Sequence, residues 1–406
     1  MPFISSVRGS FGPQSRRGAS AAAGVFFGNY YGNGSDGASV ISSDTQLVVP
    51  NKNGSYDGDY VLKQYTSLTI NSGATLTTDQ PCKGLFIYVS GNCTINGTLS
   101  MRARGAASNP DSVLGANGIR YAVRTAVGHS ASLATSEFTG CGSAIIAAVA
   151  NQPGDGGRRI IQIPKRGANG GASVGCSNNG CQVAGSTGSS GSASGTDTVS
   201  VTSGGGGAGG HYYDTNSCGG STSGLASGRG GNGTAFSGGT GGGGKMSGTG
   251  VAGSVPTQGD DNGGEGGEGG NGHCGGAHVT TGGVGNPGGW DQYGSISQSG
   301  YTQTYQRANS GTGGVIWLIV GGDLTINGAI DVRGTNNTNY SSNRTYNGNY
   351  GNGGASAGGI AILLHKGSYS NSGNIYINGG VYDIGGQGHG GAGGSGSSVA
   401  IQLANS

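Results

Sequence analysis

Charged residues are scarce in this chain of 406 residues: aspartate, glutamate, lysine and arginine together make up 9% of it, and the formal net charge is +2. Nucleic-acid-binding proteins carry basic patches and polyelectrolyte tails carry blocks of like charge, so the composition excludes both classes. Glutamate occurs only as Glu137, Glu265 and Glu268, and no stretch has the apolar period of an amphipathic helix. We therefore expect almost no helix.

Long apolar runs are also lacking. Residues 1–17 do not contain the apolar core of a secretory signal, and the longest run of small apolar residues, 144–150, is too short to cross a bilayer. The sequence predicts a protein that is made in a cytoplasm and does not insert into a membrane.

Cysteine is sparse and odd in number, which leaves at least one thiol unpaired within the chain. The seven are Cys82, Cys93, Cys141, Cys176, Cys181, Cys218 and Cys274. No CxxC pair and no histidine cluster occurs, so we expect no metal and no cofactor. Cys176 and Cys181 are close enough in sequence to form a small disulfide loop, with metal coordination or buried free thiols as the alternatives.

Glycine, by contrast, supplies 96 of the 406 residues, against a usual share of roughly 7%. Richness in glycine and serine often indicates low-complexity disorder. The glycine tracts of this chain are periodic rather than scattered, which favours an ordered, repeating structure.

The clearest repeat joins two segments that are far apart in the chain, 84–105 (GLFIYVSGNCTINGTLSMRARG) and 314–334 (GVIWLIVGGDLTINGAIDVRG). Each has an apolar run, a glycine turn, a Thr-Ile strand, Asn-Gly and a short strand that ends in Arg and Gly. Weaker relatives are 67–76 and 373–384. Short strands with glycine corners are typical of a chain that winds around a β-solenoid or bends through a meander.

The two copies predict which side chains face the interior. We expect an inward set in equivalent strands, Ile87, Val89, Ile316, Leu318 and Val320, and a core position for Trp317. Ile319 lies out of phase with this set, which predicts that it tolerates a charge better.

A period of three runs through residues 263–277, GGEGGEGGNGHCGGA, where every third residue is not glycine. Three residues per turn is the period of a polyproline II type of helix, whose N–H and C=O groups point sideways and are satisfied only by neighbours. Glycine on the other faces lets such helices approach closely. Further candidates are 204–210, 228–244 and 390–396, and together they predict a bundle held by backbone hydrogen bonds.

These tracts resemble the tip adhesins of T-even-like bacteriophages, whose glycine-rich motifs form a polyglycine II sandwich and whose variable loops touch the host receptor. The resemblance rests on composition and period over residues 153–297 and 385–396. Residues 1–14, 67–74 and 84–105 are also similar to the front of glycine-rich virion proteins of marine phages. The resemblance implies a virion appendage, although β structure after residue 313 departs from a simple attachment-domain-plus-tip layout.

The expected fold is therefore all-β, with a β-solenoid-like frame and an inserted glycine-rich polyglycine II sandwich. We expect an N-terminal attachment segment at 1–60, solenoid-like rungs at 61–110, the inserted glycine-rich domain with its recognition loops at 111–312, and returning rungs with a terminal glycine tract at 313–406.

Polar stretches rich in Tyr, Ser, Gly and Asn lie outside the repeats, and this composition is typical of recognition loops. Tyrosine and tryptophan offer rigid contact surfaces with a polar group, which suit sugar rings or outer-membrane protein loops. The alternative is that these aromatics pack over the frame. The candidate receptor-binding residues are Tyr212, Tyr213, Trp290, Tyr293, Tyr301, Tyr305, Tyr340, Tyr346 and Tyr350.

We expect no catalytic residues. No G-x-S-x-G elbow is present, and Glu265 and Glu268, which are conceivable as the two carboxylates of an inverting glycosidase, also fit a period-three ladder that faces solvent. The expected function is that of a phage tail-fibre or appendage adhesin, a virion protein whose partners are a host glycan or outer-membrane protein, other virion proteins through residues 1–60, and further copies in a trimer. The alternative is a structural part: a capsid decoration, a fibre subunit or an extracellular filament protomer.

Overall fold

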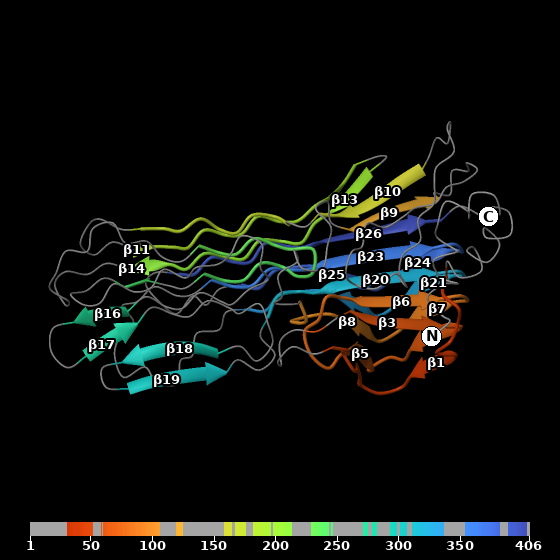
Figure 1. The fold of residues 1–406 in the computed structure, drawn as a ribbon, viewed down its shortest axis with the longest axis horizontal. Coiled ribbons are helices and arrows are strands. Elements are labelled where there is room, and N and C mark those ends of the chain that lie inside the picture. The colour runs from red at the N-terminus through yellow and green to blue at the C-terminus, as the bar shows by residue number, and fades with distance from the viewer. Residues whose placement is uncertain are drawn as a thin grey trace, which may run out of the picture.

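The computed structural model describes residues 31–51, 58, 60–105, 119–124, 158–164, 167–175, 182–195, 198–212, 229–242, 245–246, 271–274, 278–281, 293–298, 301–306, 311–336, 354–381 and 389–403. This part of the chain is all β, from β1 to β26, and contains no helix, which confirms the expectation from composition. It therefore contains no helix that is long and apolar enough to span a bilayer. The molecule is elongated, with β1 and β26 near the same end (Figure 1).

Three five-stranded parallel sheets form a column at that end. The first sheet consists of β1 (Ala38–Ile41), β4 (Ser67–Ile70), β7 (Cys93–Ile95), β21 (Leu324–Ile326) and β24 (Tyr369–Asn371). The second consists of β2 (Thr45–Leu47), β5 (Thr75–Thr78), β8 (Thr98–Ser100), β22 (Ala329–Asp331) and β25 (Asn374–Tyr376). The third consists of β3 (Val61–Tyr65), β6 (Leu85–Val89), β20 (Val315–Val320), β23 (Ile360–His365) and β26 (Ser397–Gln402). We call these sheets and the residues that they enclose the three-sheet column.

Each complete pass of the chain around the column adds one strand to the third, the first and the second sheet in turn. The first complete pass is β3–β4–β5; the strands β1 and β2 precede it, and β26 follows the fourth pass. The second pass, β6–β7–β8, lies directly beside the third, β20–β21–β22, although the two are separated by an offset of 231 residues. The third pass lies beside the fourth, β23–β24–β25, with an offset of 45 residues. Because the offsets are constant around all three sides, the predicted repeat is confirmed: its two copies are neighbours in register.

The interior of the column is apolar because alternate residues of each strand point into it. The predicted inward set, Ile87, Val89, Ile316, Leu318 and Val320, belongs to this core and is fully buried, so that prediction is confirmed. The strand β4 shows the pattern most simply, since Leu68 and Ile70 are buried and Ser67 and Thr69 are partly exposed.

Corners of the column are closed by glycine and polar ladders. A Cβ at Gly328 would overlap the carbonyl oxygen of Gly97, and a Cβ at Gly373 would overlap that of Gly328, so successive passes approach too closely for a side chain. Beside these glycines, Asn327 Nδ2 donates to Asn96 Oδ1 at 2.8 Å, and Ser372 Oγ donates to Asn327 Oδ1 at 3.0 Å. The Asn-Gly pairs of the sequence are therefore stacked corners.

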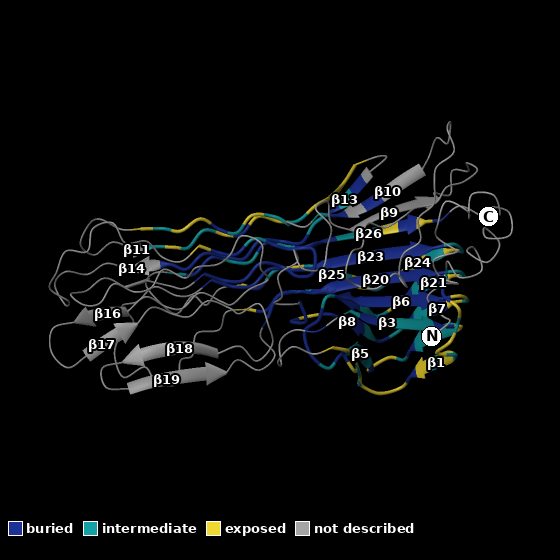
Figure 2. Cartoon of the chain, viewed as in Figure 1, coloured by how far each residue is buried: buried dark blue, intermediate teal, exposed yellow. Residues whose placement is uncertain are grey.

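The outer face of the third sheet is covered by a second apolar core. Its residues include Phe86, Trp317 and Ile362 from the column, together with Ile161, Val199 and Phe236 from the chain between the two repeat copies. The covering sheet consists of β12 (Ala193–Ser194), β13 (Thr198–Val201), β10 (Arg158–Ile163) and β9 (Ile119–Arg124). The three middle strands of the third sheet, β6, β20 and β23, are thus buried on both faces, whereas β3 and β26 at its edges are partly exposed (Figure 2).

This second core confirms the core position of Trp317 and corrects the expectation for Ile319. Ile319 does point away from the column interior, but it is only 3% exposed because it belongs to the second apolar core. The sequence pattern identifies the phase of the strand. It does not show that the other face is also covered.

Glycine tracts continue directly from the strands. The tract 311–314 leads into β20, 354–359 leads into β23, 389–396 leads into β26, and 202–210 follows β13. These tracts are extended but are not β-strands, and many of their residues are buried. They run from the column toward the opposite end of the molecule (Figure 1).

The central glycine tract, residues 203–208, donates successive N–H groups to three different neighbours. The donor and acceptor pairs, at 2.9–3.0 Å, are Gly204 to Gly358, Gly205 to Ser189, Gly206 to Gly231, Gly207 to Ala355 and Ala208 to Ser186. The same neighbour recurs at every third residue, as a helix with three residues per turn requires.

The carbonyl groups of this tract accept from three further neighbours. The donor and acceptor pairs, at 2.6–2.9 Å, are Ala168 to Ser203, Gly239 to Gly204, Gly394 to Gly205, Gly171 to Gly206, Gly242 to Gly207 and Gly391 to Ala208. The central glycine tract is therefore surrounded on six sides, and side chains would block each approach.

Two of the predicted tracts, 204–210 and 390–396, belong to this network, as do the described residues of 228–244. Of the residues 263–277, the structure describes only Asn271–Cys274, and these form a strand, β16, in an antiparallel pair, so the prediction is wrong there. Glu265 and Glu268 lie outside the described residues, as do Cys176 and Cys181.

A charge placed in the interior of the column tests the assignment of faces. Leu318→Asp should lower the free energy of unfolding by roughly 3–5 kcal/mol, because it leaves a buried charge without a partner. Ile319→Asp should cost a similar amount, since that position is also buried. The matched control is Val40→Asp in β1, where the side chain is 65% exposed and little change is expected. Urea unfolding followed by circular dichroism measures all three, and equal costs at Leu318 and Val40 would contradict the assignment.

A side chain placed in the central glycine tract tests the six-sided packing. A Cβ at Gly206 would overlap the carbonyl of Thr240, so Gly206→Val should prevent the bundle from forming and make the glycine tracts sensitive to protease. Thr187→Val on the exposed neighbouring tract is the control and should remain resistant. Limited proteolysis compares the two, and equal resistance would show that the packing at Gly206 is loose.

Candidate functional site

Four of the nine predicted receptor-binding residues lie in described strands at the end of the molecule opposite to the column (Figure 1). Tyr212 is in β14 (His211–Tyr212), Tyr293 in β18 (Tyr293–Gln298), and Tyr301 and Tyr305 in β19 (Tyr301–Gln306). The other five lie outside the described residues: Tyr213, Trp290, Tyr340, Tyr346 and Tyr350.

The stretch that contains Tyr293, Tyr301 and Tyr305 is a β-hairpin rather than the predicted loop. In its antiparallel ladder Tyr301 is opposite Gln298, and Tyr305 is opposite Gly294. Residues opposite each other share a face and successive residues alternate. Positions 301 and 305 therefore lie on one face of the hairpin and position 293 lies on the other, so the three tyrosines do not form one set.

Tyr212 also lies in a short strand rather than in a loop. The strand β14 pairs antiparallel with β11 (Gln182–Val183) and parallel with β15 (Lys245–Met246). A second hairpin at this end consists of β16 (Asn271–Cys274) and β17 (His278–Thr281). The structure thus brings segments that are far apart in sequence to one end of the molecule, where four of the nine candidate residues are carried on short β elements.

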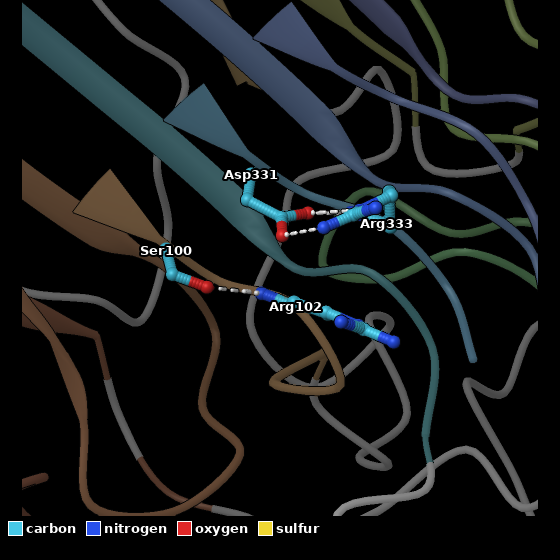
Figure 3. Close-up of polar contacts among 4 residues, drawn as sticks. All are labelled: Ser100, Arg102, Asp331 and Arg333. Carbon is cyan, nitrogen blue, oxygen red and sulfur yellow. Dashed lines mark hydrogen bonds and ion pairs between the residues drawn. The ribbon is translucent and has the colours of Figure 1, made fainter. Parts of the chain in front are cut away.

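A cluster of charged residues lies on the column itself, where β22 ends. The carboxylate of Asp331 accepts from Arg333 Nε at 2.9 Å, from Arg333 Nη2 at 2.6 Å and from the Arg333 backbone N–H at 3.1 Å (Figure 3). The Arg333 guanidinium also lies 4.4 Å from the centre of the Tyr376 ring. The hydrogen bonds to Asp331 raise the pKa of Arg333. The carboxylate side chain is only 7% exposed, and this arginine is its partner in an ion pair.

The preceding pass has the equivalent backbone N–H hydrogen bond, with a serine hydroxyl in place of the carboxylate. Ser100 pairs with Asp331 in the sheet, and Ser100 Oγ accepts from the Arg102 backbone N–H at 3.2 Å, as Asp331 does from Arg333. The Arg102 side chain is exposed, and within the described part of the chain it has no acidic partner. We call Ser100, Arg102, Asp331, Arg333 and Tyr376 the two-arginine corner, and Figure 3 shows the first four of these residues.

Other titratable groups of the column are structural. Hydrogen bonds from the Ser368 hydroxyl and N–H lower the pKa of Asp323, which continues a ladder from Asn92. Burial raises the pKa of Cys93 to about 12, so this thiol stays protonated and is a poor nucleophile. Cys82 and Cys93 are both buried in the core, where the Cys82 thiol donates to the Gly84 carbonyl at 3.5 Å. Among the described residues no group of three or more His, Cys, Asp or Glu side chains is placed to hold a metal ion.

The sequence analysis missed the two-arginine corner, although the signal is present in the repeat. Aligning the copies places Ser100-Met101-Arg102 against Asp331-Val332-Arg333. The arginine recurs and the acid does not, which identifies one paired and one unpaired guanidinium. Its neighbour Tyr376, from the fourth pass, follows only from the register of β25 on β22.

Comparison with known proteins gives no match, since no family model, no curated protein and no solved structure is similar to this chain at a significant level.

Substitutions of the two arginines of the corner form a matched pair, whose effects on the free energy of unfolding can be compared. Arg333→Ala should lower the free energy of unfolding by about 2 kcal/mol, because it leaves the buried Asp331 carboxylate with a backbone donor in place of the bidentate partner. Arg102→Ala removes an exposed side chain that has no acidic partner among the described residues, and it should cost less than about 0.5 kcal/mol. Urea unfolding measures both, and a larger cost at Arg102 would refute the assignment.

Proposed function

We propose that this chain is a bacteriophage tail-fibre or appendage adhesin that binds a receptor on the host surface. The observation that carries the proposal is the packing of the central glycine tract, in which six neighbours contribute backbone hydrogen bonds with a period of three. This pattern supports a polyglycine II sandwich, the element through which the sequence resembles phage tip adhesins. The three-sheet column, with one strand per pass in each sheet, supports a β-solenoid as the frame.

The proposed architecture suits an adhesin because it separates rigidity from recognition. Binding residues are commonly carried on variable segments that a rigid scaffold positions. Here the scaffold is stabilised by backbone hydrogen bonds and two apolar cores. Substitutions at that end therefore change the receptor that is bound without a large cost in stability.

The candidate partners follow from the residue types at that end. Tyrosine combines a rigid apolar surface with a hydroxyl, which suits stacking on a sugar ring or packing against an outer-membrane protein loop. Under this proposal residues 1–60 attach the protein to other virion proteins, and identical copies assemble as a trimer. Binding requires neither a cofactor nor catalysis.

The hairpin β18–β19 offers a test with a built-in control. Tyr301→Ala with Tyr305→Ala removes the two aromatic residues of one face, whereas Tyr293→Ala alters the other face. Adsorption of phage particles carrying the double variant should fall by an order of magnitude or more, because an aromatic anchor commonly contributes about 2 kcal/mol at an interface. Melting temperature and particle assembly should be unchanged.

A parallel set of variants, Tyr340→Ala, Tyr346→Ala and Tyr350→Ala, tests the second candidate segment in the same assay. If neither set changes adsorption, and deletion of the whole gene destabilises the particle instead, the protein is a structural virion component and not an adhesin.

A further inference from the structure

The two arginines of the two-arginine corner are held next to each other by the sheet. Arg102 follows β8 and Arg333 follows β22, and these strands are paired in register. The backbone contact continues beyond the strands, since the Ala103 N–H donates to the Arg333 carbonyl at 3.3 Å. Neighbouring strands lie about 4.8 Å apart, so the two side chains start from adjacent positions on the same side of the column (Figure 3).

Their charges are balanced by a single carboxylate. Asp331 occupies Nε and Nη2 of Arg333 and leaves Nη1 free of any hydrogen bond within the described residues. Arg102 has only Ser100 at the position equivalent to Asp331, and the Ser100 hydroxyl accepts from its backbone, not from its guanidinium. The corner therefore carries one uncompensated positive charge.

One of the two guanidinium groups is also fixed in orientation. The Asp331 carboxylate and the Tyr376 ring hold Arg333 from two sides, which reduces the entropy that it loses when it binds a second group. Beside it, Arg102 is exposed and free to rotate. A typical exposed cationic side chain is solvated by water and is not held in one orientation. Here a fixed guanidinium and an exposed one start from adjacent positions in the sheet.

We propose that Arg102 and Arg333 together bind an oxyanion, a carboxylate or phosphate group that belongs to an extended acidic polymer. Guanidinium groups present paired N–H donors that match the oxygens of both anions. A single ion at an exposed surface is weakly held and strongly screened by salt. A polymer offers many anionic groups to the site, which raises their effective concentration. The site lies just after the ends of β8 and β22 in the column, and the proposal does not depend on the adhesin function.

The test measures binding of polygalacturonate and polyphosphate to the full-length protein by isothermal titration calorimetry at about 50 mM salt, where the Debye length exceeds 10 Å. Inorganic phosphate and neutral dextran serve as the monomeric and uncharged probes. The wild type should bind at least one acidic polymer saturably and more tightly than inorganic phosphate, should lose affinity as salt rises, and should not bind dextran. The polymer that binds more tightly identifies the carboxylate or the phosphate as the preferred group.

The repeat itself supplies the decisive variants. Ser100→Asp keeps both arginines but gives Arg102 the same carboxylate partner that Arg333 has, and it should weaken polymer binding at least tenfold. Arg102→Gln should do the same if Ser100→Asp alters the fold. Lys63→Ala removes one positive charge elsewhere, from a pair with Asp36, and should leave the affinity unchanged.

Two results would overturn the proposal. One is the absence of saturable binding of either acidic polymer to the wild type. The other is an equal loss of affinity for Lys63→Ala and Ser100→Asp, which would show that binding follows net charge and not this corner. Thermal melting of each variant shows that the fold is intact, and phage adsorption, which depends on the hairpins, is measured separately.

Discussion

A backbone amide that has no partner within its own segment must find one in another segment, and this requirement shapes the whole described part of the protein. Helices meet the requirement locally, and the described residues form none. Both the column and the glycine tracts meet it laterally, between passes that lie up to 231 residues apart in the chain. Each segment is therefore stable only when its neighbours are in place.

The column and the glycine tracts are two forms of the same lateral contact. Where apolar side chains are available, the passes form parallel strands and bury two cores. Where the sequence turns to glycine, the same chain segments continue as extended tracts that bond to six neighbours instead of two. The junction is continuous: the Gly313 N–H donates to Ala357, and the Gly359 N–H donates to Val332, which lies next to the end of β22. Order in one region thus supports order in the other.

Glycine is costly in conformational entropy, and the geometry shows what offsets that cost. At Gly206, Gly207 and Gly359 a Cβ would overlap a neighbouring backbone carbonyl. The close approach that these overlaps reflect is what brings N–H and C=O groups within hydrogen-bonding distance. A scaffold built in this way depends little on side-chain identity at its ends, which leaves the end of the molecule opposite to the column free to vary and supports the proposed role in recognition.

The sequence by itself determined the all-β character, the two repeat copies and the inward residues Ile87 and Leu318, because these depend on composition and on a period of two within one strand. Only the tertiary structure decided what lies against each element. It buried Ile319 in a second core that includes residues from distant parts of the chain, and it paired 293–298 with 301–306 and made a strand of 271–274, whose glycines and tyrosines predicted other conformations. It also placed Arg102 beside Arg333. Lateral pairing joins segments that are far apart in the chain. A local pattern therefore shows which faces and backbone groups of a segment must be covered or hydrogen-bonded, and only the fold determines which other segment does this.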